Sequence, residues 1–249
     1  MKKVGVFILN YKRPDTIQKV VDSALHQTVK PEAIYVWNNN PEITTNFPGC
    51  ININSQQNMR CIVRHAVALA RPDIDAWVFV DDDVQMKPKT IENFLKYHEK
   101  YPEAILGYYG RNVLKWHLYS LSRSNWIVNR EEEVWLVMGM IHFCKREKLV
   151  NSFIMKKNIP DLPMTEDDII LCLGNRYIDK AKNYIIPYDN ESGTIPLSSK
   201  HRGLSASGGH LGRRKEAVKK ILEWAGETEL LPPKATAKKP TPTEGFKEV

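Results

Sequence analysis

The chain has 249 residues, enough to bury the core of one large domain or of two closely joined subdomains. Its composition is 42% hydrophobic and 26% charged, as in an ordinary globular protein, and its net charge is +7. The best apolar run, from Val134 to Ile141, has eight residues, and this excludes a membrane-spanning helix.

The first part of the chain predicts a β-α-β unit. Met1-Lys2-Lys3 leads directly into the apolar run from Val4 to Leu9, without the long apolar core of a signal peptide, so we expect a cytoplasmic protein. A helix follows Pro14, because apolar residues recur at helical spacing at Ile17, Val20, Val21, Ala24 and Leu25. Ala33 to Trp37 is the next strand, and Asn38-Asn39-Asn40-Pro41 ends it. A parallel sheet is therefore expected.

Further elements follow in the same α/β pattern. A helix is expected from Met59, with its inward positions at Met59, Ile62, Val63, Ala66 and Ala70, and with Arg60 and Arg64 on a different face. Pro88 to Tyr101 predicts another helix, Ile105 to Tyr109 and Val134 to Val137 predict strands, and a last helix is expected from about Arg213 to Ala225. The Lys/Pro-rich segment 231–249 has few apolar residues and predicts a disordered tail.

The cysteines and the late basic residues carry less information. Four cysteines, Cys50, Cys61, Cys144 and Cys172, show no C-x-x-C spacing, so neither a zinc site nor a disulfide framework is expected. Much of the positive charge lies late in the chain, where it is typical of a solvated helix face but could also attract phosphates. These residues are Lys200, Arg202, Arg213, Arg214, Lys215, Lys219 and Lys220.

An apolar strand that ends in three acids is the strongest functional signal. Trp77 to Val80 suits a strand buried on both faces, and Asp81, Asp82 and Asp83 follow it. Adjacent carboxylates repel one another by about 1 kcal/mol per pair near a surface, unless a cation or hydrogen-bond donors neutralise them. Side chains alternate along a strand, so Asp81 and Asp83 are available together for one manganese or magnesium ion. The alternative is an acidic turn that merely closes the strand.

A second acidic cluster, Glu166-Asp167-Asp168, begins a predicted helix. Thr165 as N-cap with Asp168 near the third helical position approximates a capping arrangement. A carboxylate held at a helix start and facing the Asp81–Asp83 cluster would equally suit a general base, or an electrostatic partner for a developing cation. The two interpretations are compatible.

Five features of the sequence form a recognisable pattern. They are the β-α-β start, the Asn-rich end of the second strand, the D-D-D strand end, M-G-M-I-H-F-C-K from Met138 and T-E-D-D-I-I-L-C-L from Thr165. Together they resemble the nucleotide-sugar glycosyltransferases of GT-A fold, and most closely the exostosin-like retaining family. The resemblance implies a Rossmann-like, mostly parallel sheet flanked by helices, with a smaller acceptor-side subdomain. It implies one domain over residues 1–230, with a nucleotide-binding half at about 1–104 and an acceptor half at about 105–230.

The resemblance also implies roles for individual residues. Those that would line the uridine pocket are Tyr11, Arg13 and Asn38. Those that would approach the diphosphate are Asn58 and Arg60, with Arg64 as a competing choice. Asp81 and Asp82 would contact ribose or donor sugar, and Asp83 would bind the metal with Asp81.

In the second half of the chain, Asp168 matches an invariant acid of the family, and Asp167 stands in place of its glutamate. Gly139 and His142 would border donor sugar and acceptor. The segments H-R-G-L-S and G-G-H-L-G-R-R resemble a loop that closes over the diphosphate, with candidates His201, Arg202 and His210.

The implied activity is metal-dependent transfer of a sugar from a UDP-sugar to a hydroxyl group with retention of configuration, with manganese favoured over magnesium. Processive sugar synthases of the same fold carry a Q-x-x-R-W element after their E-D pair, and its absence after Asp168 argues against them. Unlike Golgi members of the family, the chain shows no membrane anchor, which indicates a bacterium or a virus-infected host cell.

Two acceptors remain open. One is a glycan precursor, and the other is a hydroxylated base in DNA, favoured by the positive charge, the basic last helix and the aromatic-basic stretch from Trp116 to Trp126. Two other functions are also compatible with the acids: a two-metal phosphoesterase or nuclease built on Asp81 and Asp168, and a nucleotide-binding module without catalysis.

Overall fold

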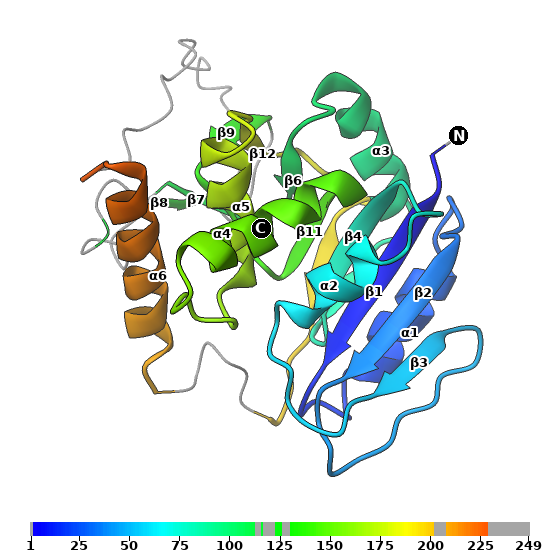
Figure 1. Ribbon diagram of the computed structural model, residues 1–249. Coiled ribbons are helices and arrows are strands. Elements are labelled where there is room, and N and C mark those ends of the chain that lie inside the picture. Colours follow the sequence, from blue (N-terminus) through cyan, green and yellow to red (C-terminus); the bar gives the residue numbers. More distant parts are fainter. Residues whose placement is uncertain (1, 113–115, 117–122, 126–129, 202–207, 229–249) are drawn as a thin grey trace, which may run out of the picture.

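The computed structural model describes residues 2–112, 116, 123–125, 130–201 and 208–228. Its centre is a sheet of eight strands in the order β3-β2-β1-β4-β11-β6-β12-β9 (Figure 1). These strands are β1 (Val4–Asn10), β2 (Ala33–Asn38), β3 (Ile51–Asn54), β4 (Ala76–Asp81), β6 (Ile105–Gly107), β9 (Glu132–Val134), β11 (Ile141–Lys145) and β12 (Asn183–Ile185).

The sheet is mostly parallel, as the sequence predicts. The neighbours β3, β2, β1 and β4 run parallel, as do β6 and β12, whereas β11 is antiparallel to β4 and β6 and β9 is antiparallel to β12. Two small sheets accompany it. One is β10-β7-β8, formed by β7 (Gly110–Asn112), β8 (Arg123–Asn125) and β10 (Leu136–Val137), and the other pairs β5 (Val84–Met86) with β13 (Thr194–Pro196).

Helices cover both faces of the sheet. Successive side chains of the central strands point to opposite faces, so each strand contributes to two cores. Phe7 of β1 and Phe79 of β4 face a core shared with α2 (Val63–Leu69), α4 (Val150–Asn158), α5 (Asp167–Tyr177) and α6 (His210–Ala225). Ile8 and Val80 face the opposite core, shared with α1 (Ile17–Leu25) and α3 (Thr90–Lys100). A short 3-10 turn, Arg146–Leu149, joins β11 to α4. The expected α/β class is therefore confirmed.

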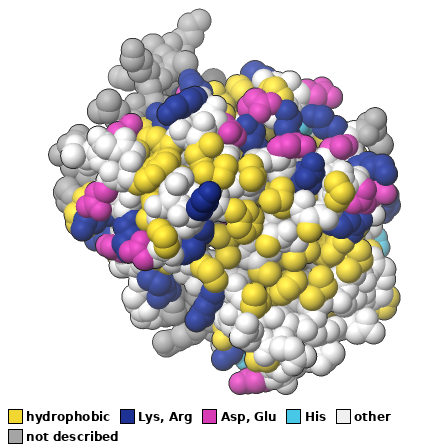
Figure 2. All heavy atoms as spheres, in the orientation of Figure 1, with side chains coloured by type: hydrophobic (Ala, Val, Ile, Leu, Met, Phe, Trp, Pro, Cys, Tyr) yellow, Lys and Arg dark blue, Asp and Glu magenta, His cyan; other side chains and the backbone are white. Residues whose placement is uncertain are grey.

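Helix α2 differs from its prediction. It begins at Val63, so Met59 and Arg60 lie outside it, and of the expected inward positions Met59, Ala66 and Ala70 are exposed. Arg64 does not face solvent, because only 2% of its surface is exposed. A tertiary hydrogen bond fixes the start of the helix, as the Ile62 N–H donates to the Met164 carbonyl at 3.1 Å. Figure 2 shows apolar side chains on this face of the molecule, in the region where Figure 1 places β2 and β3.

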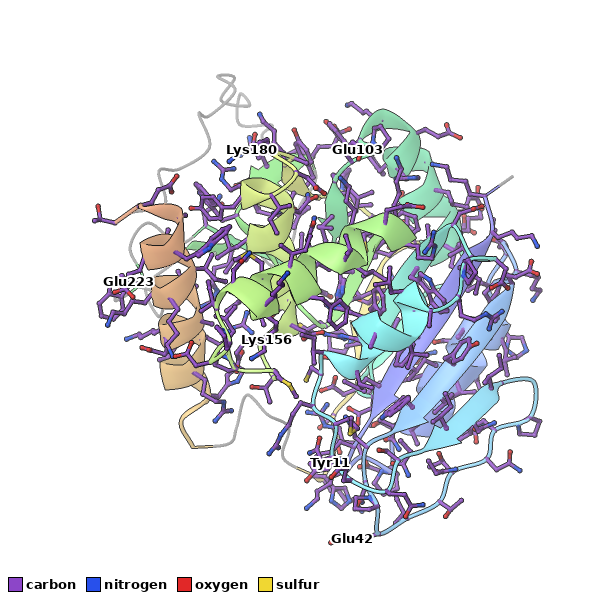
Figure 3. The ribbon with its side chains drawn as sticks, in the orientation of Figure 1. Tyr11, Glu42, Glu103, Lys156, Lys180 and Glu223 are labelled. Atoms are coloured by element: carbon purple, nitrogen blue, oxygen red, sulfur yellow. The ribbon has the colours of Figure 1, made fainter. Side chains whose placement is uncertain are left out.

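The carboxyl ends of β1, β2 and β4 lie at the same edge of the sheet. Their register pairs Leu9 with Trp37 and with Asp81, and the antiparallel β11 begins at this edge, with Ile141 opposite Val80. Tyr11, which follows β1, lies at this edge in Figure 3. Chain segments that are far apart in sequence therefore meet where the two acidic clusters are expected.

The other sequence expectations concern cysteines, membrane spans and the tail. All four cysteines are free thiols. In the described ranges, no helix has both the length and the apolar character that a bilayer crossing requires. The expected tail, residues 231–249, lies outside the described residues.

Candidate active site

A cleft of about 480 Å³ opens at this edge of the sheet. Its walls come from the loop after β1, the end of β2, the residues before α2, the end of β4, the loop before β11, and the starts of α5 and α6. Five carboxylates line it: Asp81, Asp82, Asp83, Asp167 and Asp168. Five cationic side chains also line it: Lys12, Arg13, Arg60, Arg64 and Arg214.

The first acidic cluster, called here the strand-end cluster, consists of Asp81, Asp82 and Asp83. Asp82 holds the loop after β1, because its carboxylate accepts the Tyr11 N–H at 3.0 Å and the Arg13 guanidinium at 2.7 Å. The same Arg13 nitrogen lies 2.6 Å from Asp83 Oδ2. Arg13 therefore bridges two adjacent carboxylates.

Asp81 and Asp83 remain partly open to the cleft, with 35% and 28% of their side chains exposed. Asp81 accepts one hydrogen bond from Arg64, at 3.2 Å. Desolvation raises the pKa of both carboxyl groups, and the neighbouring Asp83 and Asp82 charges raise that of Asp81 further. The strand-end cluster is thus short of positive charge.

These two carboxylates fit a divalent cation by their chemistry, since they are oxygen ligands, partly exposed, and incompletely neutralised. They do not form a complete site by themselves. Among the described residues, no group of three or more His, Cys, Asp or Glu side chains is arranged to hold a metal. Further ligands would have to come from substrate or water.

The second cluster, Glu166, Asp167 and Asp168, is called here the helix-start cluster, and it is buried. Asp167 accepts two hydrogen bonds from Arg64, at 2.5 and 3.0 Å. Arg214 of α6 donates to both oxygens of Asp168, at 3.0 and 2.8 Å, and to Glu166 at 3.0 Å. Each of the three acids therefore has an arginine partner, and Glu166 and Asp168 share Arg214.

Arginine pairing reverses the effect of burial on Asp168. Burial alone would raise its pKa, but the Arg214 charge and hydrogen bonds lower it below the usual range. The Gly139 N–H adds a further hydrogen bond at 3.1 Å. Asp168 is consequently held as an oriented carboxylate.

The capping interpretation of this cluster is wrong. Glu166, not Thr165, occupies the N-cap position of α5, and no side chain caps the helix. The Thr165 hydroxyl instead bonds to Glu166 at 3.0 Å, and Asp168 accepts the N–H of its neighbour Ile169 at 2.9 Å. The acids bind mainly arginines, and Asp168 satisfies one first-turn N–H group, that of Ile169, without forming a capping box.

Arg64 connects the two clusters, since it bonds to Asp81 and to Asp167. Gly139 leaves room for this arrangement. A Cβ at position 139 would lie 3.2 Å from Arg64 Nη2 and 3.5 Å from Asp168 Cβ. His142, in contrast, is not a cleft residue, because it is buried and its ring stacks on Phe79 at 4.9 Å.

The structure brings most of the expected site residues to the cleft. These are Tyr11, Arg13, Asn58, Arg60, Asp81, Asp82, Asp83, Asp167, Asp168 and His210. Asn38 is not among the lining residues, because it is fully buried and donates to the Asn40 and Ile43 carbonyls at 3.1 and 2.6 Å. His201 is exposed and does not line the cleft. Arg202 lies outside the described residues.

The sequence interpretation missed Lys12, Asn39 and Arg214. For Arg214 a signal existed, because positions 214, 217, 218 and 221 follow helical spacing and all four are buried. An arginine on the apolar stripe of a helix must be paired, and the nearby acids of α5 supply its partners.

A model of the family described as Glycosyl transferase family 2 matches residues 5–154, which is more than half of the chain. The matched residues include β1 to β4 and the strand-end cluster, whereas the helix-start cluster and α6 follow them. No curated protein matches the chain. The match covers more than half of the chain, and the cleft lies within reach of the matched strands β1 and β4. The chain belongs to glycosyl transferase family 2.

Proposed function

We propose that this glycosyltransferase moves a sugar from a UDP-sugar to a hydroxyl acceptor and depends on a divalent metal ion. One observation carries the proposal: a single cleft brings together the incompletely neutralised strand-end cluster, an oriented Asp168 and two cations that have no carboxylate partner among the described residues. This combination suits a reaction in which an anionic diphosphate departs while positive charge develops on a sugar.

Lys12 and Arg60 support the binding of a diphosphate. Arg13, Arg64 and Arg214 are paired with carboxylates. Within the described residues, neither Lys12 nor Arg60 makes an ion pair; the Lys12 ammonium lies 5.2 Å from the centre of the Tyr11 ring. Unneutralised cations at a cleft wall favour an anionic ligand.

Asp83 and Asp81 would hold the metal ion, with manganese favoured over magnesium. The bound ion would neutralise charge on the departing diphosphate. The partial exposure of both carboxylates and their raised pKa values support this assignment.

Asp168 would act on the sugar itself. Its lowered pKa makes it a weak proton acceptor, so it suits stabilisation of a positively charged anomeric centre better than proton abstraction. Retention of configuration, which the exostosin-like resemblance implies, stays a prediction, and the proton NMR coupling of the anomeric position in the first product would test it.

The two other functions find less support in the site. A two-metal phosphoesterase would need the helix-start cluster as metal ligands, but Arg64 and Arg214 already neutralise it. An inactive binding module would need no oriented carboxylate. In Asp168, however, hydrogen bonds from Arg214 fix both carboxylate oxygens.

For the acceptor, a glycan precursor is favoured over DNA. Three cations of α6 pair with acids of the protein: Arg213 with Glu166 at 3.4 Å, Lys219 with Glu223 at 3.8 Å, and Lys220 with Glu216 at 3.5 Å. This pairing reduces the charge that α6 could offer to DNA phosphates. Most of the stretch from Trp116 to Trp126 lies outside the described residues.

The test is release of UDP from a panel of UDP-sugars with manganese, magnesium or a chelator, for wild type, Asp83→Asn, Asp168→Asn and the control Asp73→Asn. Asp73 is an exposed acid paired with Arg71 and does not line the cleft. We expect metal-dependent release from one sugar, loss of it in Asp83→Asn, a decrease of roughly a hundredfold or more in Asp168→Asn, and no change in the control.

Metal-independent release, or an Asp83→Asn variant with wild-type activity, would contradict the metal assignment. No release from any UDP-sugar would contradict the donor. A later screen of glycan precursors and of hydroxymethylated DNA, read as glycosylated nucleosides in a digest, would separate the two acceptors.

A further inference from the structure

Arg60 has an unusual backbone conformation for a residue with a side chain. Its φ is 63°, and Lys180 is the only other non-glycine residue of the described chain with a positive φ. The left-handed region is sterically disfavoured when a Cβ is present, so surrounding contacts must maintain it. Such residues concentrate at ligand sites. Arg60 lines the cleft.

Asn39 supplies these contacts. It follows β2 and is 3% exposed. Its side-chain oxygen accepts the Met59 N–H at 3.0 Å, and its side-chain nitrogen donates to the Arg60 carbonyl at 3.1 Å. The amide thus bonds to the backbone on both sides of the 59–60 peptide. Asn58 adds a bond to the Arg60 N–H at 2.9 Å.

Asn39 is itself fixed to the central sheet. Its backbone N–H donates to the Asn10 carbonyl of β1 at 2.8 Å, and its side-chain oxygen also accepts the Trp37 indole N–H at 3.0 Å. The amide oxygen therefore has two donors, which determines the orientation of the group. Through Asn39, the position of Arg60 is tied to the ends of β1 and β2.

We propose that Asn39 is a positioning residue that holds Arg60 in the left-handed conformation, so that the Arg60 guanidinium, which has no ion pair within the described residues, binds the diphosphate of the donor. The inference rests on the proposed function, because it needs a nucleoside diphosphate in the cleft. Asn39 acts through Arg60, since the amide oxygen and one amide hydrogen already bond to protein groups.

Aspartate is the sharpest substitution at position 39. It keeps the shape and the acceptor oxygen of asparagine, but it cannot donate to the Arg60 carbonyl and places negative charge against that oxygen. Asn52→Asp is the matched control. Asn52 also bridges a loop with both ends of its amide, to the Phe47 N–H at 2.8 Å and the Phe47 carbonyl at 2.9 Å, but it does not line the cleft.

The experiment measures the dissociation constants of UDP and of uridine by calorimetry, in manganese, for wild type, Asn39→Asp, Arg60→Ala, the double variant and Asn52→Asp. We expect Asn39→Asp and Arg60→Ala each to weaken UDP binding by roughly tenfold or more, and uridine binding by less than about twofold. The double variant should bind UDP as weakly as Arg60→Ala alone, because both changes remove the same contact. Asn52→Asp should leave both constants unchanged.

Equal weakening of UDP and uridine in Asn39→Asp, or additive losses in the double variant, would overturn the positioning role. A wild-type chain that binds uridine but not UDP would overturn the inference, and one that binds neither would overturn the UDP donor as well. Should Asn39→Asp fail to fold, Asn39→Ser takes its place. Arg60→Gly should then unfold at a higher temperature than Arg60→Ala, since glycine adopts positive φ freely.

Discussion

The two acidic clusters contain three acids each and line or border one cleft, yet the pKa shifts of Asp81 and Asp168 are opposite. In the strand-end cluster, Asp81 and Asp83 are partly exposed and their pKa values are raised. In the helix-start cluster, Asp168 is buried and its pKa is lowered. The number of acids is the same, so the arginines make the difference.

The two clusters differ in how completely arginine side chains pair with their carboxylates. Arg64 and Arg214 make paired hydrogen bonds to Asp167 and Asp168, which gives a neutral, oriented unit. Arg13 is shared between Asp82 and Asp83 and leaves negative charge over. Carboxylate charge that is paired with arginine in the helix-start cluster therefore supports stability, whereas incompletely paired charge in the strand-end cluster opposes it.

The largest effect is expected from Arg214→Met, which leaves the buried Asp168 without its arginine and Glu166 with only the 3.4 Å contact to Arg213. Removal of one member of a buried ion pair costs about 3–5 kcal/mol, so the free energy of unfolding in urea should fall by about that amount. Lys215→Met, on the same helix, is the control and should change stability little. Equal stability of the two variants would show that the helix-start cluster does not depend on Arg214.

The second prediction concerns acid pH and His65, whose Nε2 lies 3.4 Å from Asp167 and whose pKa burial lowers to about 4. The unfolded chain binds this proton near pH 6.5, so the histidine contributes stability that is present above pH 6.5 and is lost as pH falls toward 4. Between pH 6.5 and 5 the loss is about 2 kcal/mol.

In His65→Gln, the decrease in the free energy of unfolding between pH 6.5 and 5 should be smaller than in wild type. The measurement is the free energy of unfolding as a function of pH. Exposed His26→Gln at the end of α1 serves as the control. An unchanged pH dependence in His65→Gln would assign the acid sensitivity to other groups, such as the buried His142, whose pKa burial also lowers.

Arg64→Lys should lower the free energy of unfolding by roughly 1–3 kcal/mol, because lysine cannot reproduce two parallel hydrogen bonds to Asp167 and a third to Asp81. Arg60→Lys is the matched control, as Arg60 has no ion pair in the described residues and should tolerate the change. If both substitutions are tolerated alike, charge alone would account for the role of Arg64.

The smallest change in stability is expected for Asp81→Asn, and its sign is opposite. A carboxyl group whose pKa is raised in the folded state lowers the free energy of unfolding as pH rises. Its removal at pH 7 should therefore leave stability unchanged or increase it by about 1 kcal/mol or less. Manganese should stabilise wild type in thermal unfolding and should stabilise Asp81→Asn less. A clear loss of stability in Asp81→Asn without metal would contradict the proposed difference between the two clusters.

The elements and the strand-end cluster could be predicted because they are encoded locally. Alternation and apolar runs identify β1, β2 and β4, and the acids that follow Val80 are adjacent in sequence. The ion pairs could not be predicted, since Arg64 is 103 residues from Asp167 and Arg214 is 46 residues from Asp168. The predicted start of α2 is wrong for the same reason: Asn39, which follows β2, fixes Met59 and Arg60 in a non-helical turn that helical spacing alone does not reveal.

The origin of Arg214 in the last described helix has a consequence for the order of folding. Residues 5–154, which match the family, contain β1 to β4 and β11 and are synthesised before α6. Glu166 and Asp168 cannot be buried at low cost until Arg214 arrives. The ion pairs that orient Asp168 therefore form only after α6 has been synthesised, and a chain cut before α6 would leave Asp168 without Arg214.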